Sequence, residues 1–274
     1  MAFGPVILFG SGETARQGRQ AQEEVLRGLP TPARVAIVET PAGFQPNVDH
    51  VTGKLRQFVE VNLQNYKPQV TIVPARGMGD PDGDPDDPEI AARLHDATYI
   101  VAGPGSPTYT ARTLAGTATF QAIRERWAAG AGLAFASAAA IAFGTHVLPV
   151  YEIYKAGEDP TWRPGLDLFA PLGLDIAIVP HWNNREGGEH LDTSRCYMGM
   201  RRFACLREML PTSTTILGID EHTSCILDPD SGTVSVRGQG EVTIMNEGGC
   251  QTVAAGESFA ISEIRAPEFA LLSR

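Results

Sequence analysis

Short apolar runs alternate with amphipathic segments along the first half of the chain. Uninterrupted apolar runs predict buried strands at residues 6–9, 34–38, 70–73, 99–102 and 133–135. Between them, apolar residues recur at helical spacing in the segments 17–29, 47–66, 88–95, 108–115 and 120–129. Continuous apolar strands that alternate with helices are typical of βαβ units, in which helices cover both faces of a parallel sheet.

The second half of the chain changes pattern. Buried strands are expected at 176–179 and 215–218, with a helix at 198–210 between them. After residue 224, short strands separated by glycine-containing turns predict a small antiparallel extension, covering about 224–264. We therefore expect residues 1–274 to form a single α/β domain, with three layers and a mostly parallel sheet flanked by helices.

Two segments match neither the apolar runs of buried strands nor the apolar spacing of helices. The acidic stretch 80–89 could suggest a calcium loop, but prolines interrupt it and the terminal bidentate glutamate is missing. We expect a solvated loop that ends at a helix N-terminus, where acidic residues suit the helix dipole. The segment 150–165 mixes aromatic and charged residues, which is typical of a surface loop or of a pocket wall.

Composition excludes several classes of partner. The chain has 274 residues, 43% of them hydrophobic, and a net charge of −10, so neither nucleic acid nor an anionic membrane is an expected partner. The four cysteines form no CxxC pair, and no signal segment or membrane span is evident, which predicts a cytoplasmic protein with reduced thiols. The glycines at 103–105 lack a dinucleotide fingerprint, so no cofactor is expected. Whether the chain forms a homodimer is a question that the sequence leaves open.

The stretch 130–144 places a serine between a strand and an alanine-rich helix start. Such a turn resembles the nucleophile elbow, in which a strained backbone projects the serine hydroxyl above the sheet edge. The usual pattern has glycine two residues before and two after the serine, whereas Phe135 and Ala139 flank Ser137 here. On these residues alone, a buried serine at the start of a helix is an equally good interpretation.

Two further polar residues follow predicted strands. His181 comes after 176–179 and Glu221 after 215–218. A serine, an imidazole that takes its proton and a carboxylate that orients the imidazole form the group set for acyl transfer. The order Ser…His…Glu differs from the Ser…acid…His order of α/β-hydrolases, which disfavours that fold.

Rival assignments within these segments are weaker. His222 competes with Glu221, but neighbouring strand residues face opposite sides, so only one of them is expected to point inward. His190 and Asp192 offer another His–acid pair, or a metal site together with His181 and Glu186. Their spacing fits no closed zinc pattern, so no metal is expected.

The order Ser…His…Glu and the local motifs resemble those of the cyanophycinase and dipeptidase E family of serine peptidases, which are relatives of the class I glutamine amidotransferases. The resemblance extends from the first strand to about Met245. It is carried by segments 35–40, 100–105, 135–140, 179–182 and 236–242, and most specifically by Leu-Gly-Ile-Asp-Glu-His-Thr at 217–223. It implies the flavodoxin-like fold of those amidotransferases, with Ser137 as nucleophile, His181 as general base and then acid, and Glu221 as the orienting carboxylate. The backbone N–H groups of Ala138 and Gly105 would form the oxyanion hole.

The resemblance implies a serine hydrolase of amide bonds that acts on a small peptide or an acyl amino acid. This sequence departs from the family in lacking both elbow glycines, and an Asn/Gly-rich segment replaces the usual basic run after His181. The usual substrates, β-linked aspartyl-arginine polymer and Asp-X dipeptides, are therefore not assigned. Polar residues near the expected site are candidates for substrate binding, with cations suited to a substrate carboxylate: Ser106, Glu152, Lys155, Asn183, Arg185 and Arg195.

Two alternatives stay open from the sequence. The first is a catalytically silent ligand-binding or regulatory protein with the same fold, because the bulk of Phe135 would shift the elbow. The second is an amidotransferase-like partner domain. The absence of a cysteine at a strand-to-helix elbow argues against it.

Overall fold

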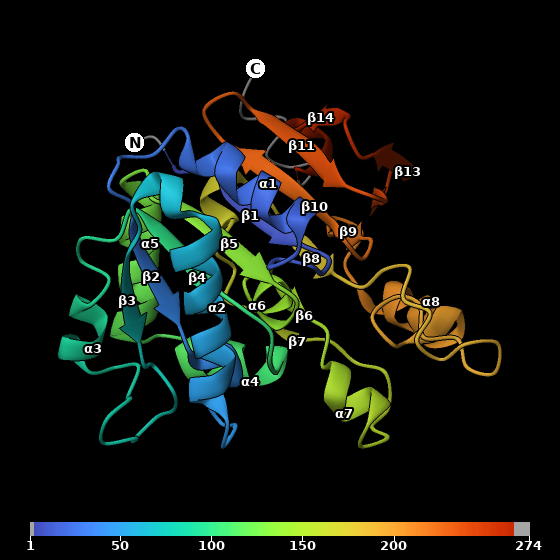
Figure 1. The fold of residues 1–274 in the computed structure, drawn as a ribbon. Coiled ribbons are helices and arrows are strands. Elements are labelled where there is room, and N and C mark those ends of the chain that lie inside the picture. Colours follow the sequence, from blue (N-terminus) through green and yellow to red (C-terminus); the bar gives the residue numbers. More distant parts are fainter. Residues whose placement is uncertain (1–2, 266–274) are drawn as a thin grey trace.

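The computed structural model describes residues 3–265, and within them the main sheet has eight strands. Figure 1 shows this sheet at the centre of the molecule, in the order β14-β11-β10-β1-β5-β4-β2-β3. Its parallel strands are β1 (Val6–Phe9), β5 (Gly132–Ala136), β4 (Tyr99–Ala102), β2 (Arg34–Val38) and β3 (Gln69–Val73). On the other side of β1, the antiparallel strands are β10 (Thr223–Asp228), β11 (Thr233–Gly238) and β14 (Ser258–Ala260).

A second sheet holds the remaining long strands. Its order is β13-β12-β9-β8, and β8 (Ile176–Val179) and β9 (Thr215–Ile219) run parallel. The antiparallel strands β12 (Glu241–Asn246) and β13 (Gly249–Ala254) complete it. The predicted antiparallel strands of the C-terminal part are confirmed, and they join both sheets. A short hairpin pairs β6 (His146–Val147) with β7 (Arg163–Pro164).

Helices cover both faces of the main sheet, which confirms the expected helix-flanked, mostly parallel architecture. On one face, α1 (Arg16–Leu26) and α2 (Val48–Asn62) bury apolar side chains such as Val25 and Phe58 against the strands (Figure 1). The other face packs against α3 (Pro88–Ala92), α4 (Pro107–Leu114), α5 (Ala118–Ala128) and α6 (Ala138–Ala142), in a hydrophobic core shared with β8 and β9. Strands β1, β4 and β5 are buried on both sides, so their sequences show no polar alternation.

The segment 150–165 corrects one expectation. It begins with a helix, α7 (Val150–Tyr154), and only the part after it has the loop character predicted from the sequence. Val150 and Ile153 are buried while Tyr151 is 46% exposed, so this short helix has an inner and an outer side. In Figure 1 it lies at the lower right of the view, on the same side of the main sheet as α8 (Gly199–Met209).

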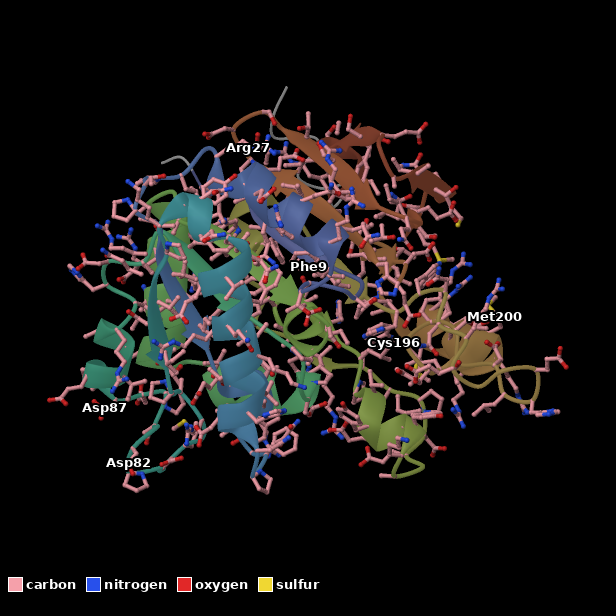
Figure 2. The ribbon with its side chains drawn as sticks, viewed as in Figure 1. Phe9, Arg27, Asp82, Asp87, Cys196 and Met200 are labelled. Carbon is pink, nitrogen blue, oxygen red and sulfur yellow. The ribbon has the colours of Figure 1, made fainter. Side chains whose placement is uncertain are left out.

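The acidic segment 80–89 forms turns and ends at α3, where the Asp87 carboxylate accepts a hydrogen bond from the Glu89 backbone N–H. Figure 2 shows Asp82 and Asp87 at the edge of the molecule, on the opposite side of the view from Cys196. The segment is therefore the solvated helix-capping loop that the sequence predicts. No helix within residues 3–265 has the length and apolarity needed to cross a membrane.

Candidate active site

Ser137 occupies a sharp turn between β5 and α6. Its backbone φ of 51° and ψ of −111° fall in a region that residues other than glycine rarely adopt, and such strain is concentrated at functional sites. The turn therefore has the strained geometry expected of an elbow, despite its departures from the glycine pattern.

The packing around the elbow explains why glycine is dispensable there. Phe135 is fully buried, and its ring stacks on Phe143 at the end of α6, with centroids 3.9 Å apart and planes within 4°. Ala139 is also fully buried. The bulky side chain thus extends into the core and ties the strand before Ser137 to the helix after it. The expectation that Phe135 shifts the elbow is not supported.

His181 lies directly after β8 and also has a left-handed backbone, with φ of 50°. Its N–H donates to the Gly10 carbonyl at 3.1 Å, and the neighbouring Trp182 N–H donates to the Ile219 carbonyl at 3.1 Å. The carboxyl end of β8 is thereby tied both to the turn after β1 and to the end of β9. These bonds fix the direction in which the imidazole leaves the backbone.

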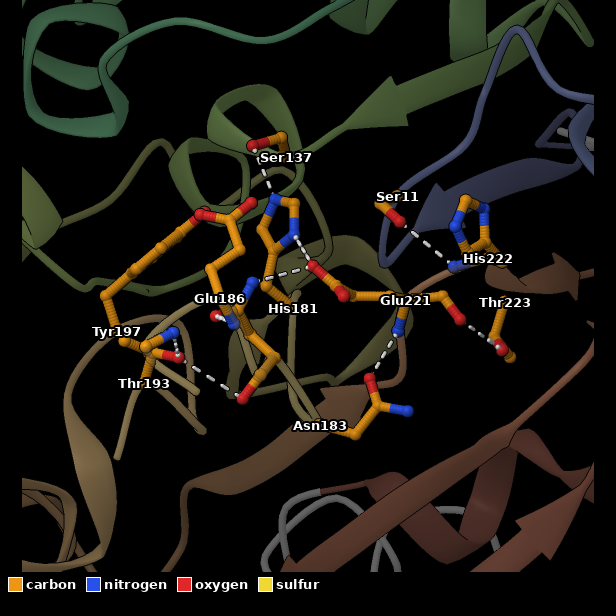
Figure 3. Close-up of polar contacts among 12 residues, drawn as sticks. Ser11, Ser137, His181, Asn183, Glu186, Thr193, Tyr197, Glu221, His222 and Thr223 are labelled. Carbon is orange, nitrogen blue, oxygen red and sulfur yellow. Dashed lines mark hydrogen bonds and ion pairs between the residues drawn. The ribbon is translucent and has the colours of Figure 1, made fainter. Parts of the chain in front are cut away.

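The structure brings Ser137, His181 and Glu221 into one hydrogen-bonded line (Figure 3). Ser137 Oγ lies 3.1 Å from His181 Nε2, and His181 Nδ1 lies 3.0 Å from Glu221 Oε1. With its proton on Nδ1, facing the carboxylate, the imidazole offers Nε2 as acceptor to the serine hydroxyl. The side chains of His181 and Glu221 are 18% and 29% exposed, so the pair is largely shielded from water.

Glu221 and His222 lie in the connection between β9 and β10 rather than on a strand. The sequence argument from alternating strand faces therefore gave an incorrect reason, although the two side chains do diverge (Figure 3). The His222 N–H donates to Ser11 Oγ at 2.9 Å, and its ring lies beside Gly12. A side chain at Gly12 would clash with that ring.

Asn184 is a site residue that the sequence analysis missed. It is 1% exposed, and its Nδ2 donates to Glu221 Oε1 at 2.9 Å, the same oxygen that faces His181. The hydrogen bond from His181 is the largest influence on the Glu221 carboxyl, and together with that from Asn184 it lowers the pKa of Glu221 although burial opposes the shift. An asparagine three residues after a histidine gives no signal in the sequence alone.

Two of the residues that line this region could offer backbone amides. Ala138 begins α6, and Gly105 lies in the loop after β4; both line the pocket that contains Ser137. Neither N–H has a hydrogen-bond acceptor within residues 3–265. A Cβ at Gly105 would lie 1.7 Å from the Pro41 carbonyl oxygen, so the loop approaches its neighbour too closely for any other residue.

The pocket beside Ser137 has a volume of about 240 Å³ and a wall of aromatic and charged side chains. Lys155 is the one predicted substrate-binding residue that lines it, and its Nζ lies 4.8 Å from the centre of the Tyr154 ring. The sequence analysis did not single out the rest of this wall: Tyr151, Tyr154, Cys196 and Tyr197, with Glu186 considered only as a metal ligand.

The structure does not bring the other predicted substrate-binding residues into this pocket. Ser106 caps α4, where its Oγ accepts a hydrogen bond from the Tyr109 N–H. Asn183 instead holds the Glu221 backbone, since its Oδ1 accepts from the Glu221 N–H at 2.9 Å. Glu152, Arg185 and Arg195 also lie outside the pocket lining. Arg195 is turned away because its guanidinium lies 3.9 Å above the Trp182 ring and donates to the Trp182 carbonyl.

A left-handed turn in the segment after His181 shapes the pocket wall. Arg195, Cys196 and Tyr197 have φ values of 57°, 56° and 69°, three consecutive left-handed residues. Their amides donate to Trp182, His181 and Thr193 carbonyls, which compensates for the unusual conformation. The turn sends the side chains of Arg195 and Tyr197 in different directions, and of these two only Tyr197 lines the pocket. Burial raises the pKa of the Cys196 thiol well above its ordinary value, so it remains protonated.

The rival pair His190 and Asp192 is not assembled. Asp192 accepts hydrogen bonds from Ser194 and from the Met200 N–H, and His190 is exposed. Among the described residues, no group of three or more His, Cys, Asp or Glu side chains is placed to hold a metal ion.

Comparison with known proteins identifies the fold. No family model and no curated protein matches the sequence. A crystal structure of a peptidase from an acI-B1 Actinobacterium matches with a TM-score of 0.74 and 24% identity, over 94% of this chain and 97% of the other. The chain has a peptidase E-like fold. A putative peptidase E protein from Listeria monocytogenes EGD-e matches with a TM-score of 0.56 and 16% identity, over 86% of this chain and 99% of the other.

The peptidase E-like fold agrees with the resemblance found in the sequence. A helix-flanked, mostly parallel sheet with antiparallel strands from the C-terminal part is confirmed as the architecture. At these identities the likeness concerns the fold, and the chemistry has to be argued from the side chains of the pocket.

Proposed function

We propose that the chain is a serine hydrolase that cleaves an amide bond in a small peptide or an acyl amino acid. The observation that carries the proposal is the continuous line from Ser137 Oγ through His181 to the Glu221 carboxylate, with contacts of 3.1 and 3.0 Å. It ends at a pocket that Ala138 and Gly105 also line, and the backbone amides of these two residues have no hydrogen-bond acceptor within residues 3–265. One structural neighbour is named a peptidase and the other a putative peptidase E protein, which supports the same class of reaction.

Ser137 attacks the scissile carbonyl carbon while His181 Nε2 takes the hydroxyl proton. Glu221 keeps the imidazole in the reactive tautomer and stabilises the imidazolium that forms. The oxyanion of the tetrahedral intermediate accepts hydrogen bonds from the amides of Ala138 and Gly105. His181 then protonates the leaving amine, and a water molecule hydrolyses the acyl-enzyme by the same route in reverse.

Labelling with a serine-directed fluorophosphonate tests this proposal without knowledge of the substrate. We expect one stable adduct, located on Ser137 by peptide mass spectrometry. It should be absent in Ser137→Ala, and its rate of formation should fall at least about a hundredfold in His181→Ala. Ser231→Ala, which changes an exposed serine in the β10–β11 turn, is the matched control and should label normally.

A folded chain that takes up no label would overturn the proposal. It would favour the alternative of a catalytically silent ligand-binding protein. Circular dichroism of the unlabelled protein distinguishes that result from a loss of fold.

A further inference from the structure

A second pocket lies on the other side of the segment that carries His181. Residues of α8, β12 and β13 line it, and its volume of about 450 Å³ falls in the range of about 300–1,000 Å³ that is typical of small-molecule sites. It shares no lining residue with the pocket beside Ser137. Adjacent residues divide between the two pockets, because His181 and Cys196 line the first whereas Trp182 and Arg195 line the second.

The second pocket contains a buried carboxylate that lacks a cationic partner. Asp220 lines this pocket and is only 7% exposed. Its Oδ2 accepts a hydrogen bond from the Glu241 N–H at 3.1 Å. Within residues 3–265, Oδ1 has no hydrogen-bond partner and the carboxylate forms no ion pair. A cationic ligand group in contact with Oδ1 would therefore be stabilised.

A guanidinium group lines the same pocket and is also unpaired. Arg195 donates to the Trp182 carbonyl at 2.9 Å and lies 3.9 Å above the Trp182 ring, but it forms no ion pair in the described part of the chain. Burial lowers the pKa of Arg195 and raises that of Asp220, and the charge of each group partly opposes the shift of the other. The two opposite charges thus lie close to each other without direct contact.

The rest of the pocket wall is largely apolar. Trp182 and Phe203 are 4% and 3% exposed, and their rings meet edge to face with centres 5.0 Å apart. Met245 lines the pocket, as does Met200, which is 56% exposed at the start of α8 (Figure 2). Methionine side chains adapt to the shape of an apolar group, so this wall suits an aliphatic or aromatic ligand body.

We propose that the second pocket binds a free α-amino acid with an apolar side chain, whose ammonium group pairs with Asp220 and whose carboxylate pairs with Arg195. A zwitterion of this kind carries both charges on one carbon atom and can pair with both groups at once. A ligand with a single charge leaves one of the two protein charges without a partner, which is unfavourable. Binding here does not require hydrolysis at Ser137, so the inference stands apart from the proposed function.

Isothermal titration calorimetry of the unsubstituted chain tests the proposal with three probes. L-Phenylalanine, phenethylamine and hydrocinnamate share one apolar body and carry both charges, only the cation and only the anion. Since each charged hydrogen bond contributes about 1.5–3 kcal/mol, L-phenylalanine should bind about tenfold or more tightly than either analogue. Trp182 is the tryptophan that lines the second pocket, and none lines the pocket beside Ser137, so tryptophan fluorescence should change with the same Kd.

Two variants locate the charged contacts. Asp220→Asn keeps the size of the side chain and an acceptor for the Glu241 N–H. It should weaken the binding of L-phenylalanine about tenfold or more without weakening that of hydrocinnamate. Arg195→Gln should weaken the binding of L-phenylalanine and hydrocinnamate but not that of phenethylamine. The matched controls Glu189→Gln and Arg185→Gln change exposed charges outside both pockets, and should leave all three affinities within about twofold.

The proposal is overturned if L-phenylalanine does not bind, or if it binds no more tightly than its two analogues. It is also overturned if its affinity is unchanged in a folded Asp220→Asn protein, because binding would then occur elsewhere. Circular dichroism shows whether each variant is folded. The comparison of the three probes on the unsubstituted chain decides the matter even where a variant does not fold.

Discussion

The two sides of the candidate site are built in different ways. On the main-sheet side, Ser137 and the amides of Ala138 and Gly105 follow β5 and β4 directly, in strand-to-helix and strand-to-loop turns. On the second-sheet side, His181, Asn184, Glu186 and Tyr197 come from one irregular segment. Side-chain and backbone hydrogen bonds between residues distant in sequence hold that segment in place.

This difference separates a part of the site that core packing holds in place from a part that polar contacts hold in place. Core packing fixes the serine side, since Phe135 and Ala139 are fully buried among apolar side chains. The other side depends on polar contacts at partly exposed positions, where a substitution changes charge and shape without unfolding the sheet. We therefore expect substitutions of the buried residues that pack behind Ser137 to alter mainly stability, and those in the 181–197 segment to alter reactivity and selectivity.

The largest effect that tests this comparison is on stability. Phe135→Ala removes a fully buried ring that stacks on Phe143, so the free energy of unfolding should fall by about 3–5 kcal/mol. Urea denaturation measures the change. Phe44→Ala is the matched control, since Phe44 is 49% exposed, and should cost less than about 1 kcal/mol. Similar losses for the two variants would contradict the view that the elbow is held by core packing.

A smaller effect is expected for Asn184 as a positioning residue. Asn184→Ala removes the donor to Glu221 Oε1, so the rate constant for fluorophosphonate labelling of Ser137 should fall about 10- to 100-fold. Because the ionised form of Glu221 loses a hydrogen bond, the pKa of Glu221 should rise, which an NMR titration of its carboxyl carbon measures.

Asn183→Ala provides the control for this prediction. Asn183 is the adjacent residue of the same type, but it is exposed and contacts the Glu221 backbone rather than the carboxylate. Its labelling rate should stay within about threefold of the unsubstituted chain. If the two variants behave alike, or if the pKa of Glu221 does not rise in Asn184→Ala, Asn184 does not act through the carboxylate.

The smallest effect concerns the pH dependence of stability. The pKa of Glu221 is lowered in the folded chain, first by its bond to His181, so the ionised carboxylate favours the folded state. Its contribution is complete above the ordinary glutamate pKa of about 4.3 and is lost as the pH falls through the lower folded value. Glu221→Gln should thus reduce stability by about 1 kcal/mol at pH 7, and the difference should shrink below about pH 4.

Urea denaturation of both proteins between pH 3 and 7 measures this difference. Glu189→Gln, in an exposed position outside the pocket, should show no comparable pH-dependent change. A difference between Glu221→Gln and the unsubstituted chain that persists at pH 3 would mean that the carboxylate charge is not what stabilises the site.

Local sequence patterns predicted the strands on which the site is built. The apolar runs before Ser137 and His181 were found because buried parallel strands need continuous apolar residues, which leave a visible pattern. The polar residues that follow them were assigned to one site because a serine, an imidazole and a carboxylate form the group set for acyl transfer. The partition of β8 and β9 into a second sheet was not predicted, since strand pairing depends on contacts between distant segments.

By itself, the sequence determined the α/β architecture and the serine turn, because each depends on residues close together in the chain. The candidate triad came from residue types that follow predicted strands and from the resemblance to a known family. Only the tertiary structure decided which polar residues after His181 face the pocket. Glu186 reaches it and Arg185 does not, and Arg195 turns back onto Trp182 while Tyr197, two residues later, reaches Glu186. The physical reason is that a segment without periodicity takes its shape from long-range hydrogen bonds and a left-handed turn, which residue spacing does not encode.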